Sequence, residues 1–392
     1  MANSQHEYLQ THPHLSFELN LTRANPRFWL LLGEISSKCA HVEATPITKQ
    51  TLRQLNHLYL ARGVNATTAI EGNTLEEEEV LKRISGDLKL PKSKDYLGRE
   101  VDNIVRAYNE ILRTVSTGTF VISVEQIKHW NKMILSDLEV EDHVEPGEVR
   151  SVNVHAGPYL APPARDAEHL LHRLCDWLNS DDFESPDGSW ATAHSFIKAV
   201  TAHVYIEWIH AFGDGNGRLG RLIEFACLAN GGIPAVSSHV LQSHYNDTRT
   251  DYYRRLNESS QGQGDLTGFL TYAAQGFRDG LAEQLDRLNA EAELLMWRVL
   301  VDEALAGRSS DVAQRRRALA LELGKHENGV PRDELITLTS QIAKSYMSKT
   351  TKTLSRDLGE LDRLKLIEVQ GGRVKPRLWR VRALRPWTMS DT

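Results

Sequence analysis

Residues 209–221 read Ile-His-Ala-Phe-Gly-Asp-Gly-Asn-Gly-Arg-Leu-Gly-Arg, and the fold is organised around this stretch. His210 stands at the end of one helical pattern, and a glycine-rich loop separates it from the start of another. Gly215, Asn216 and Gly217 adopt positive φ angles at little cost, so we expect successive backbone N–H groups to turn inward and form an anion-binding nest. The nest would lie at a helix N-terminus, where free donors and the helix dipole favour phosphate.

Charged side chains around this loop have the types that phosphate chemistry needs. His210 is a candidate general base, and Asp214 is a candidate ligand for the magnesium that accompanies polyphosphates. Arg218 and Arg221 are counter-charges for phosphate. A P-loop is excluded because no Gly-Lys-Ser/Thr follows, and an EF-hand is excluded because the twelfth position from Asp214 is Phe225. A plain turn accounts for the glycines and Asp214, but not for the histidine and both arginines in register.

The stretch closely resembles the signature of the Fic (Fido) family, His-Pro-Phe-x-Asp/Glu-Gly-Asn-Gly-Arg-x-x-Arg. Every polar position matches, and Ala211 stands where the family usually has proline. The resemblance implies a mainly α protein, with a Fic-type helical core and a small β-hairpin flap. It also implies an enzyme that transfers AMP from ATP, with Mg²⁺, to a Ser, Thr or Tyr hydroxyl of a protein, which could be the enzyme itself.

The resemblance assigns a role to each residue of the motif. His210 would be the catalytic base and Asp214 the metal ligand. The residues that would bind the nucleotide are Gly215, Asn216, Gly217, Arg218 and Arg221. A tyrosine of this family lines the adenine pocket, and Tyr252 or Tyr253 is its candidate here, although a tyrosine that only packs is equally compatible with the pattern. The nucleotide itself could also be UTP or CDP-choline, because the motif does not encode adenine contacts.

A second short motif lies about 140 residues upstream. Thr67-x-x-x-Glu71-Gly72-Asn73 matches the Ser/Thr-x-x-x-Glu-Gly/Asn inhibitory motif of Fic proteins. By itself Glu71 reads as a solvated helix charge. In the family this glutamate pairs with the second motif arginine, here Arg221, and occupies the space of the ATP γ-phosphate. A carboxylate that replaces a phosphate against arginine is physically reasonable.

Residues 146–163 alternate apolar and polar positions around a turn, which is typical of a β-hairpin in an otherwise helical chain. A structural loop is the alternative. The stretch is similar to the Gly-x-x-Arg segment and flap of Fic proteins, and a flap would hold the target through Val152, Asn153 and Val154 by pairing with its backbone.

Apolar spacing predicts helices over residues 28–37, 47–59, 101–115, 124–135, 167–178, 190–209 and 281–305, after an extended or weakly ordered arm over residues 1–25. A further helix would end at Gly72, and another would begin at Leu75. His194 and His203 read as core or capping histidines rather than metal ligands, since no ligand spacing joins them.

The C-terminal part differs in charge from the rest. Residues 309–392 hold 17 Lys and Arg against 10 Asp and Glu, whereas the remainder holds 29 against 42. The pattern there is helix, a second helix opening at 331–335, a third helix at 348–364, and a basic hairpin of 367–375 and 378–381. This order resembles a winged helix-turn-helix, which binds DNA or serves as a protein-interaction or dimerisation module. DNA and a homodimer are therefore candidate partners.

We accordingly expect four parts: an N-terminal helical region with the inhibitory helix at 1–95, a catalytic core at 96–280, a helical connector at 281–310 and a winged helix at 311–385. Of the 392 residues, 41% are hydrophobic and 25% charged, with a net charge of −6, which is typical of a soluble globular protein. The three cysteines are widely spaced, and there is neither an apolar signal region nor an apolar run of membrane-spanning length. These features indicate a cytoplasmic protein without membrane contact.

Two other functions fit the same sequence. In one, the enzyme removes AMP from a protein or both adds and removes it, and Glu71 activates water. In the other, the chain is chiefly a DNA-binding regulator whose Fic domain modifies itself.

Overall fold

The computed structural model describes residues 2–118, 120–185, 188, 190–261 and 264–382. The chain forms two compact units, one of Met1–Ala44 and Thr48–Leu285, the other of Thr45–Ile47 and Asp286–Thr392. The predicted domain limits at residues 95, 280 and 310 stay predictions, and the predicted end at 385 lies outside the described residues.

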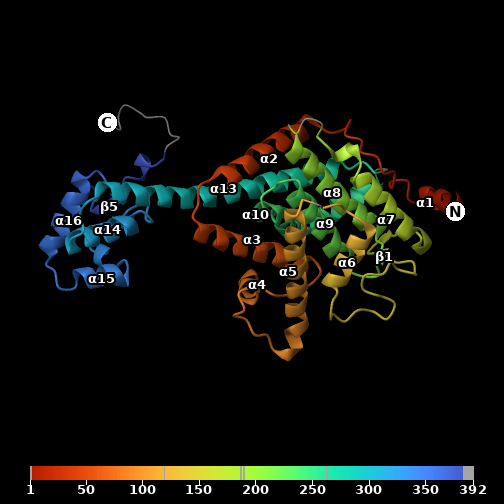
Figure 1. Cartoon of the computed structure of the whole chain (residues 1–392), viewed down its shortest axis with the longest axis horizontal. Helices are drawn as coiled ribbons and strands as arrows, with labels where there is room; N and C mark the ends of the chain where they lie inside the picture. Colours follow the sequence, from red (N-terminus) through yellow and green to blue (C-terminus); the bar gives the residue numbers. More distant parts are fainter. Residues whose placement is uncertain (1, 119, 186–187, 189, 262–263, 383–392) are drawn as a thin grey trace. The chain divides into compact units, whose positions relative to one another are not determined.

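Helices build almost all of the first unit, so the mainly α fold is confirmed (Figure 1). The elements before the motif are α1 (Ala2–Thr11), α2 (Pro26–Ala44), α3 (Lys49–Ile70), α4 (Glu77–Ile84), η1 (Lys92–Lys94), α5 (Asp95–Ser116), α6 (Val124–Ile134), β1 (His155–Ala156), β2 (Tyr159–Leu160), α7 (Ala164–Leu178), η2 (Asp181–Phe183) and α8 (Ala191–Ile209). After it come α9 (Asn216–Asn230), α10 (Ala235–Ser238), α11 (Val240–Asp247), α12 (Arg249–Gln261) and α13 (Thr267–Ala304).

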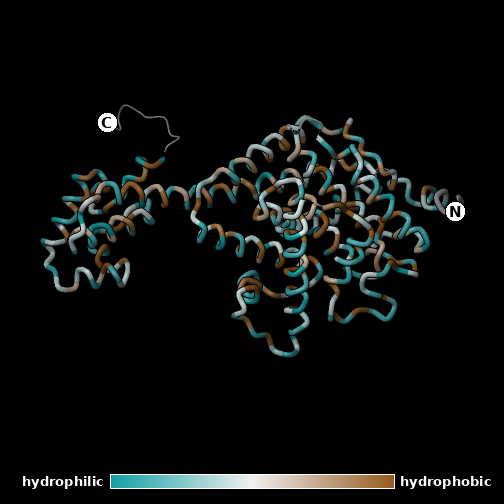
Figure 2. Tube along the Cα trace, in the orientation of Figure 1, coloured by the Kyte–Doolittle hydropathy of each residue, from teal (hydrophilic) through white to brown (hydrophobic). Residues whose placement is uncertain are grey.

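Helices α8 and α9 form the centre of this unit and carry the motif loop between them (Figure 1). Helix α8 packs against α2 and α7, and α9 packs against α3, α5 and α6. Buried side chains lie on nearly all sides of α8, as expected of a helix surrounded by others. Helix α5 is instead amphipathic, with hydrophilic and hydrophobic residues mixed along its trace (Figure 2). Val101, Ile104 and Ile111 of its apolar face are buried. The motif is therefore held by the most buried part of the unit.

Two predictions for the N-terminal half were wrong. The arm begins with a helix, α1, because Tyr8 is buried and its hydroxyl accepts a hydrogen bond at 3.1 Å from Arg173 of α7. The patterns at 47–59 and 66–70 belong to one helix, α3, rather than two. Gly63 lies within this helix, at a point where His239 is so close that a Cβ atom would overlap the imidazole.

The second unit has its own core, which includes Trp297 and Val301 of α13 together with Leu319, Leu361 and Val374. Its elements after α13 are α14 (Asp311–Leu323), β3 (Val330–Pro331), η3 (Leu335–Thr337), α15 (Ser340–Tyr346), α16 (Thr351–Arg363), β4 (Ile367–Gln370), β5 (Arg373–Pro376) and η4 (Leu378–Arg380). The strands form an antiparallel sheet in the order β3-β5-β4, with Val369 opposite Val374. The winged-helix prediction rests on this order and stays a prediction.

Local details of this unit differ from the pattern. Val330–Pro331 is a strand rather than the opening of a helix, and α15 begins only at Ser340. The hairpin is formed by β4 and β5 alone, while Leu378–Arg380 is a short 3₁₀ helix. Gly371 and Gly372 turn the hairpin with φ angles of 58° and 78°, as a two-residue primed turn requires.

In the part of the chain that the structure describes, no helix has both the length and the apolar character needed to cross a membrane.

Candidate functional site

The motif histidine leaves helix α8 in a strained conformation. His210 has φ 47° and ψ 53°, which is left-handed and uncommon for a residue with a Cβ atom, and its N–H still donates to the Ile206 carbonyl at 2.9 Å. This conformation ends the helix and turns the imidazole out of it, and such strain is typical of functional sites.

The loop makes an anion site in a different way from the predicted one. Gly215 has φ 80°, but Asn216 and Gly217 are already the first residues of α9, so the expectation of positive φ at all three was wrong. The first N–H groups of a helix have no acceptor within it. The free donors therefore come from the N-terminus of α9, which follows one left-handed glycine, and such a helix start still binds anions.

Two side chains fix the loop. Asn216 is 2% exposed, and its amide accepts a hydrogen bond from the Phe212 N–H at 3.0 Å and donates to the Phe212 carbonyl at 2.8 Å. Arg150 donates from Nε to the His210 carbonyl at 2.7 Å, and its backbone N–H donates to the carbonyl of Ala211. The side chain of Asn216 is thus occupied within the loop, and any contact of Asn216 with a nucleotide would be through its backbone. Ala211, which stands where the family usually has proline, is buried, and its carbonyl accepts the hydrogen bond from the Arg150 N–H.

A cavity of about 530 Å³ lies beside the loop. Its walls come from α3, the β1–β2 hairpin, the end of α8, the start of α9, and α12, and they consist of Glu71, Ala156, Gly157, Pro158, Tyr159, Glu207, Trp208, His210, Gly217, Arg221, Tyr253, Leu256, Asn257 and Ser260. The fold therefore brings the predicted base, the second arginine and the predicted inhibitory glutamate to one cavity.

The imidazole of His210 is set up to accept a proton. Its Nδ1 lies 3.3 Å from the carbonyl oxygen of Glu207, which can only accept, so Nδ1 carries the hydrogen and Nε2 keeps its lone pair. Burial lowers the pKa of His210 below its ordinary value of 6.5, and the charge of Glu207 opposes this only in part. The ring is therefore neutral at pH 7, as a general base must be.

Glu71 and Arg221 form the ion pair that the resemblance implies. Helix α3 ends at Ile70, so Glu71 caps it and extends toward α9. Arg221 donates to Glu71 Oε1 at 2.5 Å and, through Nε, to the Thr67 hydroxyl at 2.8 Å. Arg221 is 1% exposed, and although burial acts against the cation, the charge of Glu71 raises the pKa of Arg221. Gly217 makes room for the pair, because a Cβ atom there would overlap the Glu71 carboxylate.

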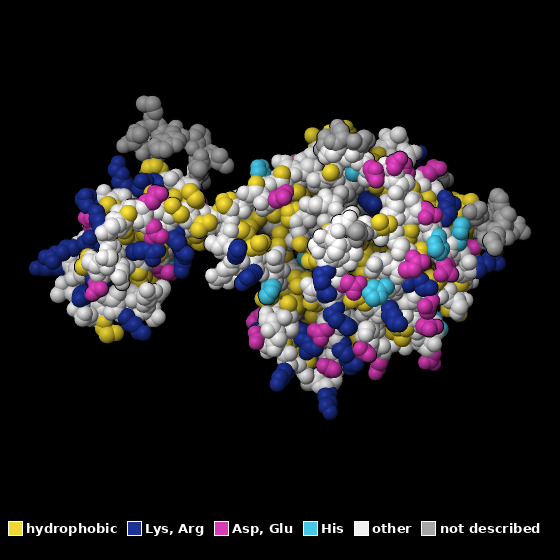
Figure 3. Space-filling view, in the orientation of Figure 1, with side chains coloured by type: hydrophobic (Ala, Val, Ile, Leu, Met, Phe, Trp, Pro, Cys, Tyr) yellow, Lys and Arg dark blue, Asp and Glu magenta, His cyan; other side chains and the backbone are white. Residues whose placement is uncertain are grey.

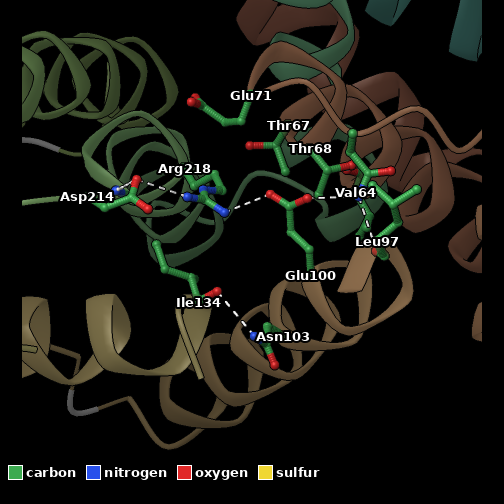
Figure 4. A network of polar contacts seen from close by, with 12 residues as sticks. Val64, Thr67, Thr68, Glu71, Leu97, Glu100, Asn103, Ile134, Asp214 and Arg218 are labelled. Carbon is green, nitrogen blue, oxygen red and sulfur yellow. Dashed lines mark hydrogen bonds and ion pairs between the residues drawn. The ribbon is translucent and has the colours of Figure 1, made fainter. Parts of the chain in front are cut away.

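Asp214 and Arg218 lie outside the set of residues that line the cavity. Asp214 Oδ1 accepts from the Gly215 N–H at 2.5 Å and from Arg218 at 3.2 Å, while 45% of its side chain stays exposed. Arg218 turns instead toward α5, where it pairs with Glu100 at 2.7 Å (Figure 4). Its sequence-based assignment as a phosphate ligand stays a prediction.

Asp214 suits magnesium as a single ligand. Among the described residues, no group of three or more His, Cys, Asp or Glu could hold a metal ion by itself. Mg²⁺ in nucleotide sites is bound by one or two carboxylates, with phosphate oxygens and water as the remaining ligands. A half-exposed carboxylate beside a helix N-terminus that favours phosphate fits such a site.

The two candidate tyrosines have different environments. Tyr253 is 48% exposed and lines the cavity, whereas Tyr252 is fully buried and its hydroxyl lies 3.0 Å from Nε2 of His203. His203 is itself fully buried, in keeping with the core role predicted for it. Tyr253 is therefore the tyrosine placed to contact a ligand.

The hairpin is shorter than its pattern. Only His155–Ala156 and Tyr159–Leu160 pair as strands, and Val149 bridges to Phe212 of the motif loop instead. Among the residues predicted to form the target-docking flap, Val152 is exposed. Asn153 accepts a hydrogen bond from the first N–H of α7, and the carbonyl of Val154 accepts one from Ala161. These three residues precede the paired strands, and their docking role stays a prediction.

Two carboxylates of the site were missed by sequence reasoning. Glu207 lies one helical turn before His210 and lines the cavity. Burial acts against its charged form, but His203 holds the pKa of Glu207 below its ordinary value. A carboxylate within the apolar run of α8 was a usable signal. Glu100 lies on α5, far from either motif in sequence, and carried no such signal.

Comparisons with known proteins relate the part of the chain that holds this site to a family. Residues 121–228 match the Fic/DOC family model, a range that includes the whole motif loop. The chain therefore contains a Fic/DOC domain. Protein adenylyltransferase fic-1 of Caenorhabditis elegans is 24% identical over 289 residues, covering 71% of this chain and 50% of that protein. Protein adenylyltransferase Fic of Nematostella vectensis is 27% identical over 209 residues, covering 53% and 45%.

Solved structures of Fic proteins share the fold. A Fic family protein from Desulfovibrio desulfuricans G20 superposes with a TM-score of 0.56 at 22% identity, covering 90% of this chain and 96% of that one. The chain spans about half the length of the adenylyltransferases that it matches.

Proposed function

We propose that this protein is a protein adenylyltransferase that transfers AMP from ATP to a Ser, Thr or Tyr hydroxyl and that Glu71 inhibits it. The observation that carries the proposal is the cavity that His210, Arg221, Gly217 and Glu71 line together. A base, an anion-binding helix N-terminus and a buried cation are the parts that nucleotidyl transfer needs. The relatives named adenylyltransferases support the same reaction class.

In this mechanism Nε2 of His210 takes the proton of the target hydroxyl as its oxygen attacks the α-phosphate. Pyrophosphate leaves from the opposite side, and the proton stays on the imidazole until solvent removes it. The N–H groups at the start of α9 stabilise charge on the phosphate oxygens, and Arg221 neutralises the distal phosphate. Asp214 would hold Mg²⁺, which would neutralise charge that develops on the phosphates.

The Glu71–Arg221 pair keeps this site from binding ATP productively. The carboxylate occupies Arg221 and the space above Gly217, where a Cβ atom would already overlap it. A γ-phosphate bears the same charge as the carboxylate and requires the same cation, so the two compete.

Removal of AMP is a second candidate for the same cavity. Only Oε1 of Glu71 faces Arg221, and 31% of the side chain is exposed at the cavity wall, so the carboxylate could also orient a water molecule. Protein labelled with AMP by a Glu71→Gly variant and then incubated with the wild type separates the cases, because release of AMP requires a hydrolytic role of Glu71.

The choice of nucleotide can be tested in cell lysate. The purified Glu71→Gly variant, in which the ion pair no longer blocks the site, is incubated with labelled ATP, UTP or CDP-choline. It is expected to label lysate proteins, or itself, from ATP at least about tenfold more than from the others, equivalent to about 1.4 kcal/mol. Tyr253 is the cavity residue available to stack on the base. Preferential labelling from UTP or CDP-choline would replace AMP transfer by another nucleotidyl or phosphocholine transfer at the same site.

The second unit is proposed to bind DNA. Its visible face shows more Lys and Arg than Asp and Glu (Figure 3), and Lys349, Lys352 and Arg356 are exposed at and before the start of α16. Affinity for duplex DNA is expected to fall steeply as the salt concentration rises. Replacing the three residues by alanine should reduce the slope of log affinity against log salt concentration by about 0.9 for each DNA phosphate that the variant no longer neutralises. Lys82→Ala, on α4 of the first unit, is the control. Binding that does not respond to salt, or no binding at low salt, favours a protein-interaction module.

A further inference from the structure

Glu100 is a buried carboxylate that neither sequence motif includes. It lies on α5, is 8% exposed, and divides its two oxygens between two partners. Oε1 accepts from Arg218 at 2.7 Å, and Oε2 accepts from the Asn73 amide at 2.8 Å. Asn73 in turn donates to the Leu97 carbonyl, so the orientation of the Glu100 carboxylate is fixed from both sides.

Arg218 therefore lies between two carboxylates of unequal environment (Figure 4). The side chains of Arg218 and Glu100 are 9% and 11% exposed, and their distance is 2.7 Å. Asp214 is 45% exposed and its distance from Arg218 is 3.2 Å. A short, largely buried ion pair is stronger than a longer one that water screens. The charge of Arg218 is consequently neutralised mainly by Glu100.

We propose that Glu100 is a positioning residue that keeps Asp214 available for a divalent cation by neutralising Arg218. Without the Glu100 charge, Arg218 would have Asp214 as its remaining carboxylate partner. It would pair with that carboxylate and compete with the cation for it. This inference rests on the proposed function, because the cation would be bound together with a nucleotide.

The ion pair of Glu100 with Arg218 also connects the motif loop to the segment that follows the inhibitory helix, α3. Asn73 follows Glu71 by two residues and holds Glu100 in place, while Glu71 holds Arg221. The segment 71–73 thus contacts one motif arginine directly and is linked to the other through Glu100.

The test measures binding of Mn²⁺ in the presence of ADP, which lacks the γ-phosphate that competes with Glu71 and does not turn over. Free Mn²⁺ is followed by its electron paramagnetic resonance signal in the full-length protein. Glu100→Gln is expected to weaken Mn²⁺ binding about tenfold, while ADP affinity measured without metal changes less than twofold. Asp102→Asn is the matched control, since Asp102 is another carboxylate of α5 that pairs with an arginine, Arg83.

A second variant separates charge balance from mere damage to the fold. In Glu100→Gln/Arg218→Gln the arginine that pairs with Asp214 is removed as well, so Mn²⁺ affinity should return to within about threefold of the wild type. Equal Mn²⁺ affinity in the wild type and Glu100→Gln overturns the inference, and so does a double variant that binds as weakly as the single one. The double variant also decides the case if Glu100→Gln does not fold. If the wild type does not bind ADP at all, the proposed function fails, and the inference fails with it.

Discussion

Replacing His210 by alanine is expected to lower AMP transfer by about 10²–10⁴-fold, the usual contribution of a positioned general base. Among the described residues of the cavity wall, no other side chain can substitute for it. The carboxylate of Glu207 is directed toward His203, with which its Oε1 atom pairs at 3.8 Å, and Glu71 is bound to Arg221. The rate is best measured in a Glu71→Gly background, where the ion pair no longer limits transfer.

His129→Ala is the control for this prediction, because His129 is an exposed histidine of α6 that pairs with Glu110 and does not line the cavity. Its rate should equal that of the Glu71→Gly parent. Transfer by His210→Ala within about tenfold of the parent would remove His210 from the role of base.

Replacing Glu71 by glycine is expected to raise AMP transfer at least about tenfold. The change frees the buried Arg221 and the space above Gly217. Removing the partner of a buried charge shifts energies by up to several kcal/mol, and the 31% exposure of Glu71 reduces the effect. Position 71 accepts glycine, because it lies beyond the last residue of α3. Arg221→Ala in the same background should lower the rate again, since the freed arginine is needed for the distal phosphate.

Glu76→Gly is the matched control, an exposed carboxylate five residues further along, at the N-cap of α4, where glycine is also accepted. It should leave the rate unchanged. An unchanged rate of AMP transfer in Glu71→Gly would contradict the inhibitory role and leave Glu71 as an ordinary helix charge. If the variant had instead lost the ability to release AMP from labelled protein, Glu71 would be a hydrolytic residue.

The motif loop was largely predictable because its residues are adjacent in sequence and each has a distinct local preference. The histidine ends one helix and the loop precedes the next, as the pattern indicates, although α9 begins already at Asn216. Asn216 was less predictable, since its side chain could bind either a ligand or the loop, and the Phe212 hydrogen bonds show that it binds the loop. The same holds for Tyr252 and Tyr253, which are neighbours in sequence but differ in burial.

Features that depend on distant packing could not be read from local patterns. The helix α1 forms where the sequence is polar, because Tyr8 is buried, with its hydroxyl bonded to Arg173 of α7. Helix α3 continues through Gly63, where the close approach of His239 leaves no room for a Cβ atom. Glu100 acquires its role only from the fold, which places α5 beside the start of α9. No periodicity of α5 distinguishes this carboxylate from its exposed neighbours.

The most direct test of the central claim, AMP transfer under the control of Glu71, compares two labels of ATP on the Glu71→Gly protein. With the label on the α-phosphate, protein is expected to become radioactive, whereas the Glu71→Gly/His210→Ala double variant should transfer no label. With the label on the γ-phosphate, protein should stay unlabelled, because pyrophosphate leaves. Label from the γ-phosphate, or none from the α-phosphate on any protein including the enzyme itself, would contradict the account.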